Sequence, residues 1–255
     1  MASHGVPRSA NTRPARTEQA RAKELAKIED YQALVSLVQT KMAEREYTAD
    51  VLALTSKLLT WNPEYYTIWN HRRRILLGGL FPQSNPSSPP VPESTAEATA
   101  TAAEEKTHAL LLSELNFLLP LFLSHPKAYT LWTHRLWLLR HSLSHLPCAL
   151  SHPLWADELR LCNRLLTLDP RNFHGWGYRK LVAERLESMD PSGAVAVVEQ
   201  EFGYANRMVE ANLSNFSAWH ARAGWGVKAL EARHAGADER LRFFENGLSP
   251  SRNGF

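Results

Sequence analysis

Apolar residues recur at spacings of three and four in four separate stretches of the chain. The stretches are residues 51–59, 115–122, 159–168 and 202–209. This spacing places the apolar side chains on one face of a helix. Pro63, Pro126 and Pro170 follow the first three stretches, and proline cannot continue a helix. The pattern therefore predicts four amphipathic helices, each followed by a turn. Pro120 lies inside the second stretch and is expected to kink or shorten that helix.

A second motif, aromatic-x-x-Trp-x-x-Arg, follows each turn. Its four copies are Tyr66/Trp69/Arg72, Tyr129/Trp132/Arg135, Phe173/Trp176/Arg179 and Phe216/Trp219/Arg222. We expect the motif to open a second helix, so that the repeating unit is a helical hairpin of about 43 residues, the spacing between the last two tryptophans. One hairpin cannot bury both of its faces, and neighbouring hairpins must therefore stack. The prediction is an all-α fold.

The motif also predicts how the hairpins touch. The aromatic, Trp and Arg stand at positions i, i+3 and i+6, and we expect the aromatic and the Trp to wedge between adjacent hairpins. The Arg can cap carbonyls or pair with an acid. Glu114, Glu158 and Glu201 each stand twelve residues before the proline position of their repeat. This regularity suggests a buried Arg–Glu pair between neighbouring hairpins.

The regular pattern is interrupted once and stops before the end of the chain. The first two tryptophans are 63 residues apart, and residues 82–107 are rich in Pro, Ser, Thr, Ala and Glu. Such a segment buries too little apolar surface to become ordered, so we expect a disordered insertion. Residues 1–30 are expected to be a basic arm and the start of the first helix, 31–225 the repeat domain, and 226–255 an atypical, poorly ordered tail.

Composition narrows the class of protein. Hydrophobic residues make up 44% of the chain and charged residues 22%, with a net charge of +3. This balance gives no case for nucleic-acid binding, and the N-terminal basic residues are diluted by acids. Two cysteines are too few for a disulfide framework or a thiolate metal site. No secretory signal is visible, and no stretch of about 18 apolar residues suggests a membrane span. We expect a cytoplasmic protein.

Motifs for stand-alone catalysis are absent from the sequence. There is no Walker-type or GxGxxG phosphate loop and no GxSxG nucleophile motif. His141 and His145 have the spacing of a zinc pair, but the residues between them lack the Glu of HExxH, so we expect no metal site. The Arg72–Arg74 run is more simply a solvated helix face than a targeting patch.

A period near 43 would also suit HEAT-type repeats, but the residues indicate another family. Asn172–Arg179, Asn215–Trp219 and Pro126–Arg135 resemble the repeat of protein prenyltransferase α subunits. The resemblance is greatest to the Rab geranylgeranyltransferase (type II) α subunit, because the α subunit of farnesyltransferase and geranylgeranyltransferase I tends to have Tyr where Phe173 stands. It implies a right-handed superhelix, or solenoid, of antiparallel hairpins.

The resemblance also implies a function. The chain would be the α subunit of a heterodimer whose β subunit holds zinc and the prenyl diphosphate, and this chain would bind no cofactor itself. The complex would transfer geranylgeranyl from geranylgeranyl diphosphate, bound at the subunit boundary, to C-terminal cysteines of Rab GTPases presented by an escort protein. Lys127 would contact the diphosphate, with Tyr129, Asn172 and His174 in support. The isolated chain would be inactive.

Two other functions fit the same sequence. One is the α subunit of farnesyltransferase or geranylgeranyltransferase I. The other is a non-catalytic helical-repeat scaffold that binds proteins on its concave face.

Overall fold

The computed structural model describes residues 17–82 and 93–247. Its helices are α1 Glu18–Ala43, α2 Ala49–Trp61, α3 Tyr66–Ile75, α4 Glu93–Ser124, α5 Tyr129–His145, α6 Cys148–Leu168, α7 Phe173–Met189, α8 Ala194–Ala211, α9 Phe216–Ala232 and α10 Ala237–Gly247, with a π-helical turn at Leu76–Leu80. These described residues contain no strand. The chain divides into a first unit, Met1–Asn62 with Asn70–Leu80, and a second unit, Pro63–Trp69 with Phe81–Phe255.

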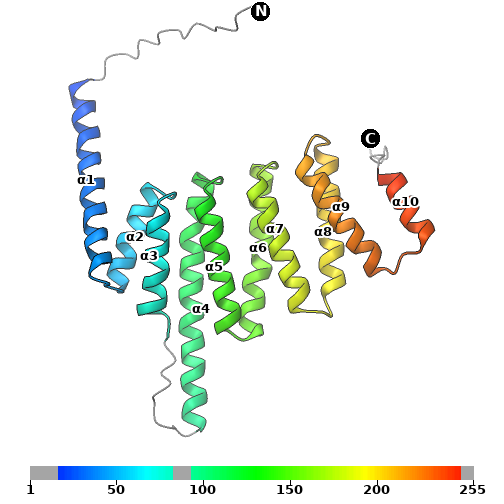
Figure 1. Cartoon of the computed structure of the whole chain (residues 1–255), viewed down its shortest axis with the longest axis horizontal. Coiled ribbons are helices and arrows are strands. Elements are labelled where there is room, and N and C mark those ends of the chain that lie inside the picture. The colour runs from blue at the N-terminus through cyan, green and yellow to red at the C-terminus, as the bar shows by residue number, and fades with distance from the viewer. Residues whose placement is uncertain (1–16, 83–92, 248–255) are drawn as a thin grey trace, which may run out of the picture. The chain divides into compact units, whose positions relative to one another are not determined.

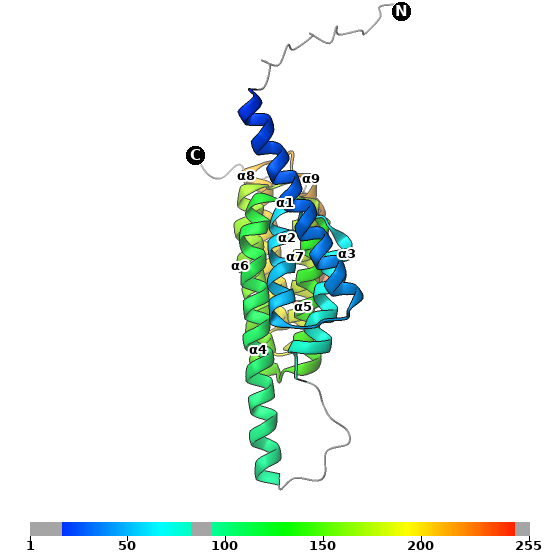
Figure 2. The same cartoon turned by 90° about the vertical axis from the view of Figure 1, so that its left-hand side faces the viewer.

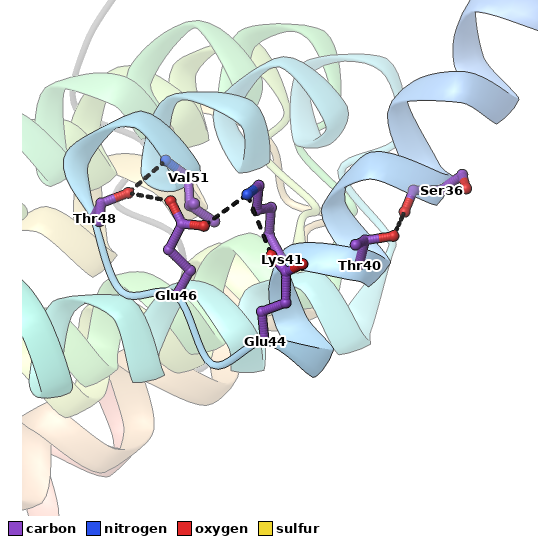
Figure 3. Close-up of polar contacts among 7 residues, drawn as sticks. All are labelled: Ser36, Thr40, Lys41, Glu44, Glu46, Thr48 and Val51. Carbon is purple, nitrogen blue, oxygen red and sulfur yellow. Dashed lines mark hydrogen bonds and ion pairs between the residues drawn. The ribbon is translucent and has the colours of Figure 1, made fainter.

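In the first unit, a short polar turn joins α1 to α2 (Figure 3). The Lys41 ammonium donates to the carboxylates of Glu44 at 3.2 Å and Glu46 at 2.7 Å. The Thr48 hydroxyl accepts from the Val51 amide and so caps α2. Because hydrogen bonds to the Lys41 ammonium favour the ionised carboxylate, they lower the pKa of Glu46.

Arg72 and two glycines hold the end of α3 within this unit. The Arg72 guanidinium donates to the Leu52 carbonyl at 3.0 Å and to the Thr55 and Ser56 hydroxyls, each at 2.8 Å. A Cβ atom at Gly79 would lie 1.9 Å from the Tyr47 carbonyl oxygen, which only glycine avoids.

The second unit is a stack of hairpins. The pairs α4/α5, α6/α7 and α8/α9 stand side by side along the chain (Figure 1), and the turned view shows α4 running past the end of α5 (Figure 2). The prediction of an all-α fold built from antiparallel hairpins is confirmed. Pro120 lies inside α4 without ending it, so the expected shortening of this helix is wrong.

Two buried ion pairs join successive hairpins in this unit. Arg135 donates to both carboxylate oxygens of Glu158, at 2.6 and 2.7 Å, and Arg179 does the same to Glu201, at 2.7 and 2.6 Å. The predicted Arg–Glu pairing is thus confirmed at both junctions. Burial alone would lower the pKa of Arg135, but the charge and hydrogen bonds of Glu158 together raise it. The carboxylate of Glu114 lies 3.6 Å from His134.

The first aromatic of each motif does not wedge between hairpins, and that part of the packing prediction is wrong. The exposed fractions are 58% for Tyr66, 63% for Tyr129, 69% for Phe173 and 84% for Phe216. The indoles of Trp69, Trp132 and Trp176 are buried, and Trp219 is partly buried. Each residue turns a helix by about 100°, so positions i and i+6 lie about 120° apart. With the Trp and the Arg inward, the first aromatic falls on the rim.

Two predicted disordered regions contain helix instead. Residues 93–107 form the first turns of α4, and Thr107 is buried. Residues 226–247 complete α9 and form α10, and Ala229 and Leu230 are buried. Ala and Glu dominate the first region and favour helix once α4 has a core to pack against. Residues 1–16, 83–92 and 248–255 lie outside the described part of the chain, so the predictions made for them stay predictions.

One stretch among the described residues, Thr99–Ser124 in α4, is long and apolar enough to cross a membrane by length and composition alone. The expectation that no stretch meets this measure is therefore wrong. Leu111, Leu118 and Phe122 in this stretch are fully buried, and the polar Glu114 is buried with them. These are the contacts that the first helix of a hairpin makes in a stack.

Candidate functional site

The turns between the two helices of each hairpin share one hydrogen-bond pattern. Each motif Trp donates its indole N–H to the backbone carbonyl six residues earlier. The bonds are Trp69 to Pro63 at 2.7 Å, Trp132 to Pro126 at 3.0 Å, Trp176 to Pro170 at 2.9 Å and Trp219 to Leu213 at 2.8 Å. A buried indole N–H needs such a partner, so the pattern fixes each turn against its own second helix.

The same carbonyls also accept a side chain from the next repeat. The bonds are Thr130 to Pro63 at 2.6 Å, Asn172 to Pro126 at 2.9 Å and Asn215 to Pro170 at 2.8 Å. Each turn in the second unit is thereby tied to the turn that follows it. The sequence contained a signal for this contact, because Asn precedes the aromatic in the last two motifs, but Thr130 has no such signature.

The four predicted site residues come together at two neighbouring turns. Lys127 directly follows Pro126, whose carbonyl accepts from Asn172. The Asn172 side chain also caps α7, accepting from the backbone amides of His174 and Gly175. The rings of Tyr129 and His174 are 5.8 Å apart.

The side chain of Lys127 is 79% exposed, and its ammonium lies 3.7 Å from the Asp169 carboxylate. This places a solvent-facing cation beside a tyrosine and a histidine. The arrangement can attract an anion, and the predicted diphosphate contact stays a prediction. Sequence reasoning missed Asp169, which carries no motif of its own.

A buried network lies behind these turns. The Tyr178 hydroxyl on α7 donates to the Glu158 carboxylate at 2.7 Å, and the same carboxylate accepts from Arg135 on α5. Burial raises the pKa of Tyr178 well above its usual value, and the Glu158 charge raises it further. The hydroxyl therefore stays protonated and donating, and the network fixes α5 relative to α7.

An open cavity of about 620 Å³ lies between α7 and α9. Phe173 and Phe216 stand at it, and Trp176 and Trp225 form part of its wall. Gly177 and Gly224 also line it, and a Cβ atom at either position would meet no atom within 4 Å among the described residues. Glycine inside a helix costs about 1 kcal/mol relative to Ala, so these two residues keep the cavity open at a cost in helix stability.

This geometry defines a helical-repeat protein with an exposed rim of aromatic and basic side chains. The model of the protein prenyltransferase alpha subunit repeat matches residues 48–78, 111–142 and 155–186. These ranges coincide with the first three of the four motifs. The chain therefore belongs to the proteins built from prenyltransferase alpha subunit repeats.

Curated relatives agree with this assignment. The chain is 34% identical over 219 residues to the geranylgeranyl transferase type-2 subunit alpha of Saccharomyces cerevisiae, covering 86% of this chain and 57% of the relative. It is 38% identical over 209 residues to the subunit of the same name from Mus musculus, covering 81% of this chain and 31% of the relative. The chain thus spans between about a third and just over half of these relatives.

A solved structure, Candida albicans protein geranylgeranyltransferase-I complexed with GGPP, covers 86% of this chain and 72% of its own at 18% identity and a TM-score of 0.41. So low a score adds nothing to the assignment, which rests on the repeats and the curated relatives.

Proposed function

We propose that this chain is the α subunit of a Rab geranylgeranyltransferase. In this function it supports a zinc-bearing β subunit in the transfer of geranylgeranyl from geranylgeranyl diphosphate to the C-terminal cysteines of Rab GTPases, which an escort protein presents. The observation that carries the proposal is Lys127, an exposed cation held at a turn that hydrogen bonds tie to the neighbouring turn. The names of the curated relatives support the subtype.

A large partner would explain the exposed aromatic row, which consists of Tyr66, Tyr129, Phe173 and Phe216. Exposed aromatic side chains that stand together are typical of protein interfaces, where they are enriched. The row ends beside the cavity between α7 and α9, which offers a concave surface to the same partner. We propose that the β subunit docks along this row. Both described cysteines are free, in keeping with a cytoplasmic protein.

The chemistry assigns Lys127 one task. When geranylgeranyl moves to a thiolate, the bond from its first carbon to the diphosphate oxygen breaks, and negative charge builds up on the leaving group. A positive charge placed beside that group stabilises the transition state. Zinc in the partner would lower the pKa of the acceptor thiol. The chain itself supplies the cation and the surface that orients it, so the chain without its partner should be inactive.

Co-expression with candidate β subunits, followed by a transfer assay on a double-cysteine Rab tail with its escort protein, tests the proposal. Wild-type complex should transfer geranylgeranyl, and Lys127→Ala should slow turnover about 10- to 100-fold without preventing assembly, as expected for the loss of one charge-stabilising group. Lys106→Ala, which removes an exposed lysine of α4, is the matched control.

Three outcomes would contradict parts of the proposal. Turnover by Lys127→Ala at the wild-type rate would remove Lys127 from the mechanism. Transfer to isolated CaaX peptides without an escort protein would indicate the farnesyltransferase or geranylgeranyltransferase I type. Failure to bind any zinc-containing β subunit would indicate a non-catalytic scaffold.

A further inference from the structure

We propose that Asp169 is a positioning residue for Lys127, and that its carboxylate sets where the lysine ammonium stands before the diphosphate arrives. This inference rests on the proposed function. The ammonium of Lys127 and the carboxylate of Asp169 lie 3.7 Å apart, across the boundary between two repeats.

The backbone around the pair is fixed from both sides. Asn172 donates its side-chain amide to the Pro126 carbonyl, one residue before Lys127. Its own backbone amide donates to the Asp169 carbonyl at 3.1 Å. Asn172 therefore ties the backbone next to Lys127 to the backbone of Asp169, and the two charged side chains start from a set separation.

The equivalent position in the other repeats shows what is special about Asp169. The residue before the proline position is Asn62 in the first repeat, His125 in the second and Asn212 in the fourth. The Asn212 side chain stays within its own turn and accepts from the amide and hydroxyl of Ser214. In the described part of the chain, Lys127 is the partner recorded for the Asp169 carboxylate, which makes no such bond in its own turn. The acid therefore stands opposite the lysine.

The neighbouring cation does not compete for this carboxylate. Arg171, two residues after Asp169, reaches toward the next turn and donates to the Ser214 hydroxyl at 2.7 Å. The equivalent positions in two successive repeats thus differ in kind, since Lys127 faces a charge and Arg171 faces a neutral hydroxyl. The charge of Asp169 acts on Lys127.

The pair has two opposing effects on the reaction. A lysine held by a carboxylate loses rotamer freedom before substrate binds, so less ordering remains for the transition state. The same carboxylate repels the diphosphate and weakens its binding in the ground state. Asp169 therefore raises the rate of transfer from bound substrate and weakens the binding of free substrate. A residue that merely maintains the fold would change the amount of active enzyme and leave the KM unaltered.

Asp169→Asn in the complete complex is the test, because asparagine already stands at this position in two other repeats. For an exposed pair we expect a fall in kcat of about two- to fivefold, with a lower KM for geranylgeranyl diphosphate. Asp169→Glu should keep at least half of the wild-type kcat. In a Lys127→Ala background, Asp169→Asn should leave kcat unchanged. Asp190→Asn, at the C-cap of α7, is the matched control and should behave as wild type.

The outcomes separate this inference from the proposed function. Independent, multiplicative losses for Lys127→Ala and Asp169→Asn in the double variant would overturn the positioning role and leave the proposed function in place. A fall in kcat with unchanged KM that Asp169→Glu does not rescue would show a structural role and would overturn it as well. Absence of transfer by the wild-type complex would overturn the proposed function, and the inference with it.

Discussion

The inward and outward halves of the repeated motif take opposite positions. The Trp and the Arg face inward, where the indole N–H and the guanidinium reach buried acceptors in the next layer or in their own turn. The aromatic that begins the motif stands on the exposed rim, and Phe216 is the most exposed of the four. One short motif thus supplies both the contacts that stack hairpins and a row of side chains left for another molecule. Repetition in a sequence can therefore reflect a binding surface as well as a core.

Arg135→Met tests the inward half and should have the largest effect. It leaves the Glu158 carboxylate buried without its guanidinium partner. Breaking a buried pair in this way typically costs about 3–5 kcal/mol. Urea or thermal unfolding followed by circular dichroism would measure the loss of unfolding free energy.

Arg160→Met is the matched control, since Arg160 pairs with Asp157 on the exposed face of α6 and exposed pairs contribute at most about 1 kcal/mol. Equal losses for the two variants would show that the buried pair has no special role in stacking.

His141 tests the inward region by pH. It lies at 9% exposure, stacked on Phe81 and His145, and burial followed by the nearby charge of His145 lowers its pKa to about 4. The neutral ring is therefore favoured in the folded state. Its contribution to stability is complete above the unfolded pKa of about 6.5 and is lost as the pH falls from there through 4. We expect this loss to be about 2 kcal/mol, since the site is only partly shielded from water.

Denaturant titrations of the wild type and His141→Phe at pH 7 and pH 4.5 give the comparison. The variant should lose less stability on acidification, because it has no proton to take up at this position. Parallel losses in the two proteins would contradict the assigned cause.

The fold was predictable where the sequence is periodic. The spacing of apolar residues, the turn prolines and the twelve-residue register of Glu158 and Glu201 led to the hairpins and to both buried pairs. Composition misled at residues 93–107, because Ala- and Glu-rich sequence suits helix as well as disorder and the packing of α4 decides between them. The tail after Arg222 misled for a similar reason, since its glycines weaken α9 without preventing it.

The candidate site was predictable only as a set of neighbours. Lys127, Tyr129, Asn172 and His174 follow from the resemblance, and the structure brings them to adjacent turns. Asp169 could not be foreseen, because a contact between repeats has no signature within either repeat. The exposed aromatics were misplaced because a spacing of three is only approximately one helical turn, so the error grows over two steps.

Asn172→Ala tests the boundary between the two halves. It removes the cap of α7 and the bond to the Pro126 carbonyl, and together these should cost about 1–2 kcal/mol. Asn172→Asp separates the two effects, since its carboxylate still accepts from the helix amides but cannot donate to Pro126. We expect that variant to keep most of the stability and to lose transfer activity, because the turn carrying Lys127 is released. Full activity in Asn172→Asp would contradict the role of that bond.

Gly224→Leu tests the outward half and should have the smallest effect on the fold. A side chain there projects into the cavity between α7 and α9, where it meets no described neighbour, and replacing a helical glycine adds up to about 1 kcal/mol of stability. If the cavity receives the partner, the filled variant should be at least as stable as wild type yet co-purify with less β subunit. Gly203→Leu in α8, outside the cavity lining, gains helix propensity without filling the cavity and should assemble normally. Normal assembly by Gly224→Leu would mean that the open glycines do not serve the partner, and the outward half of the motif would then need another explanation.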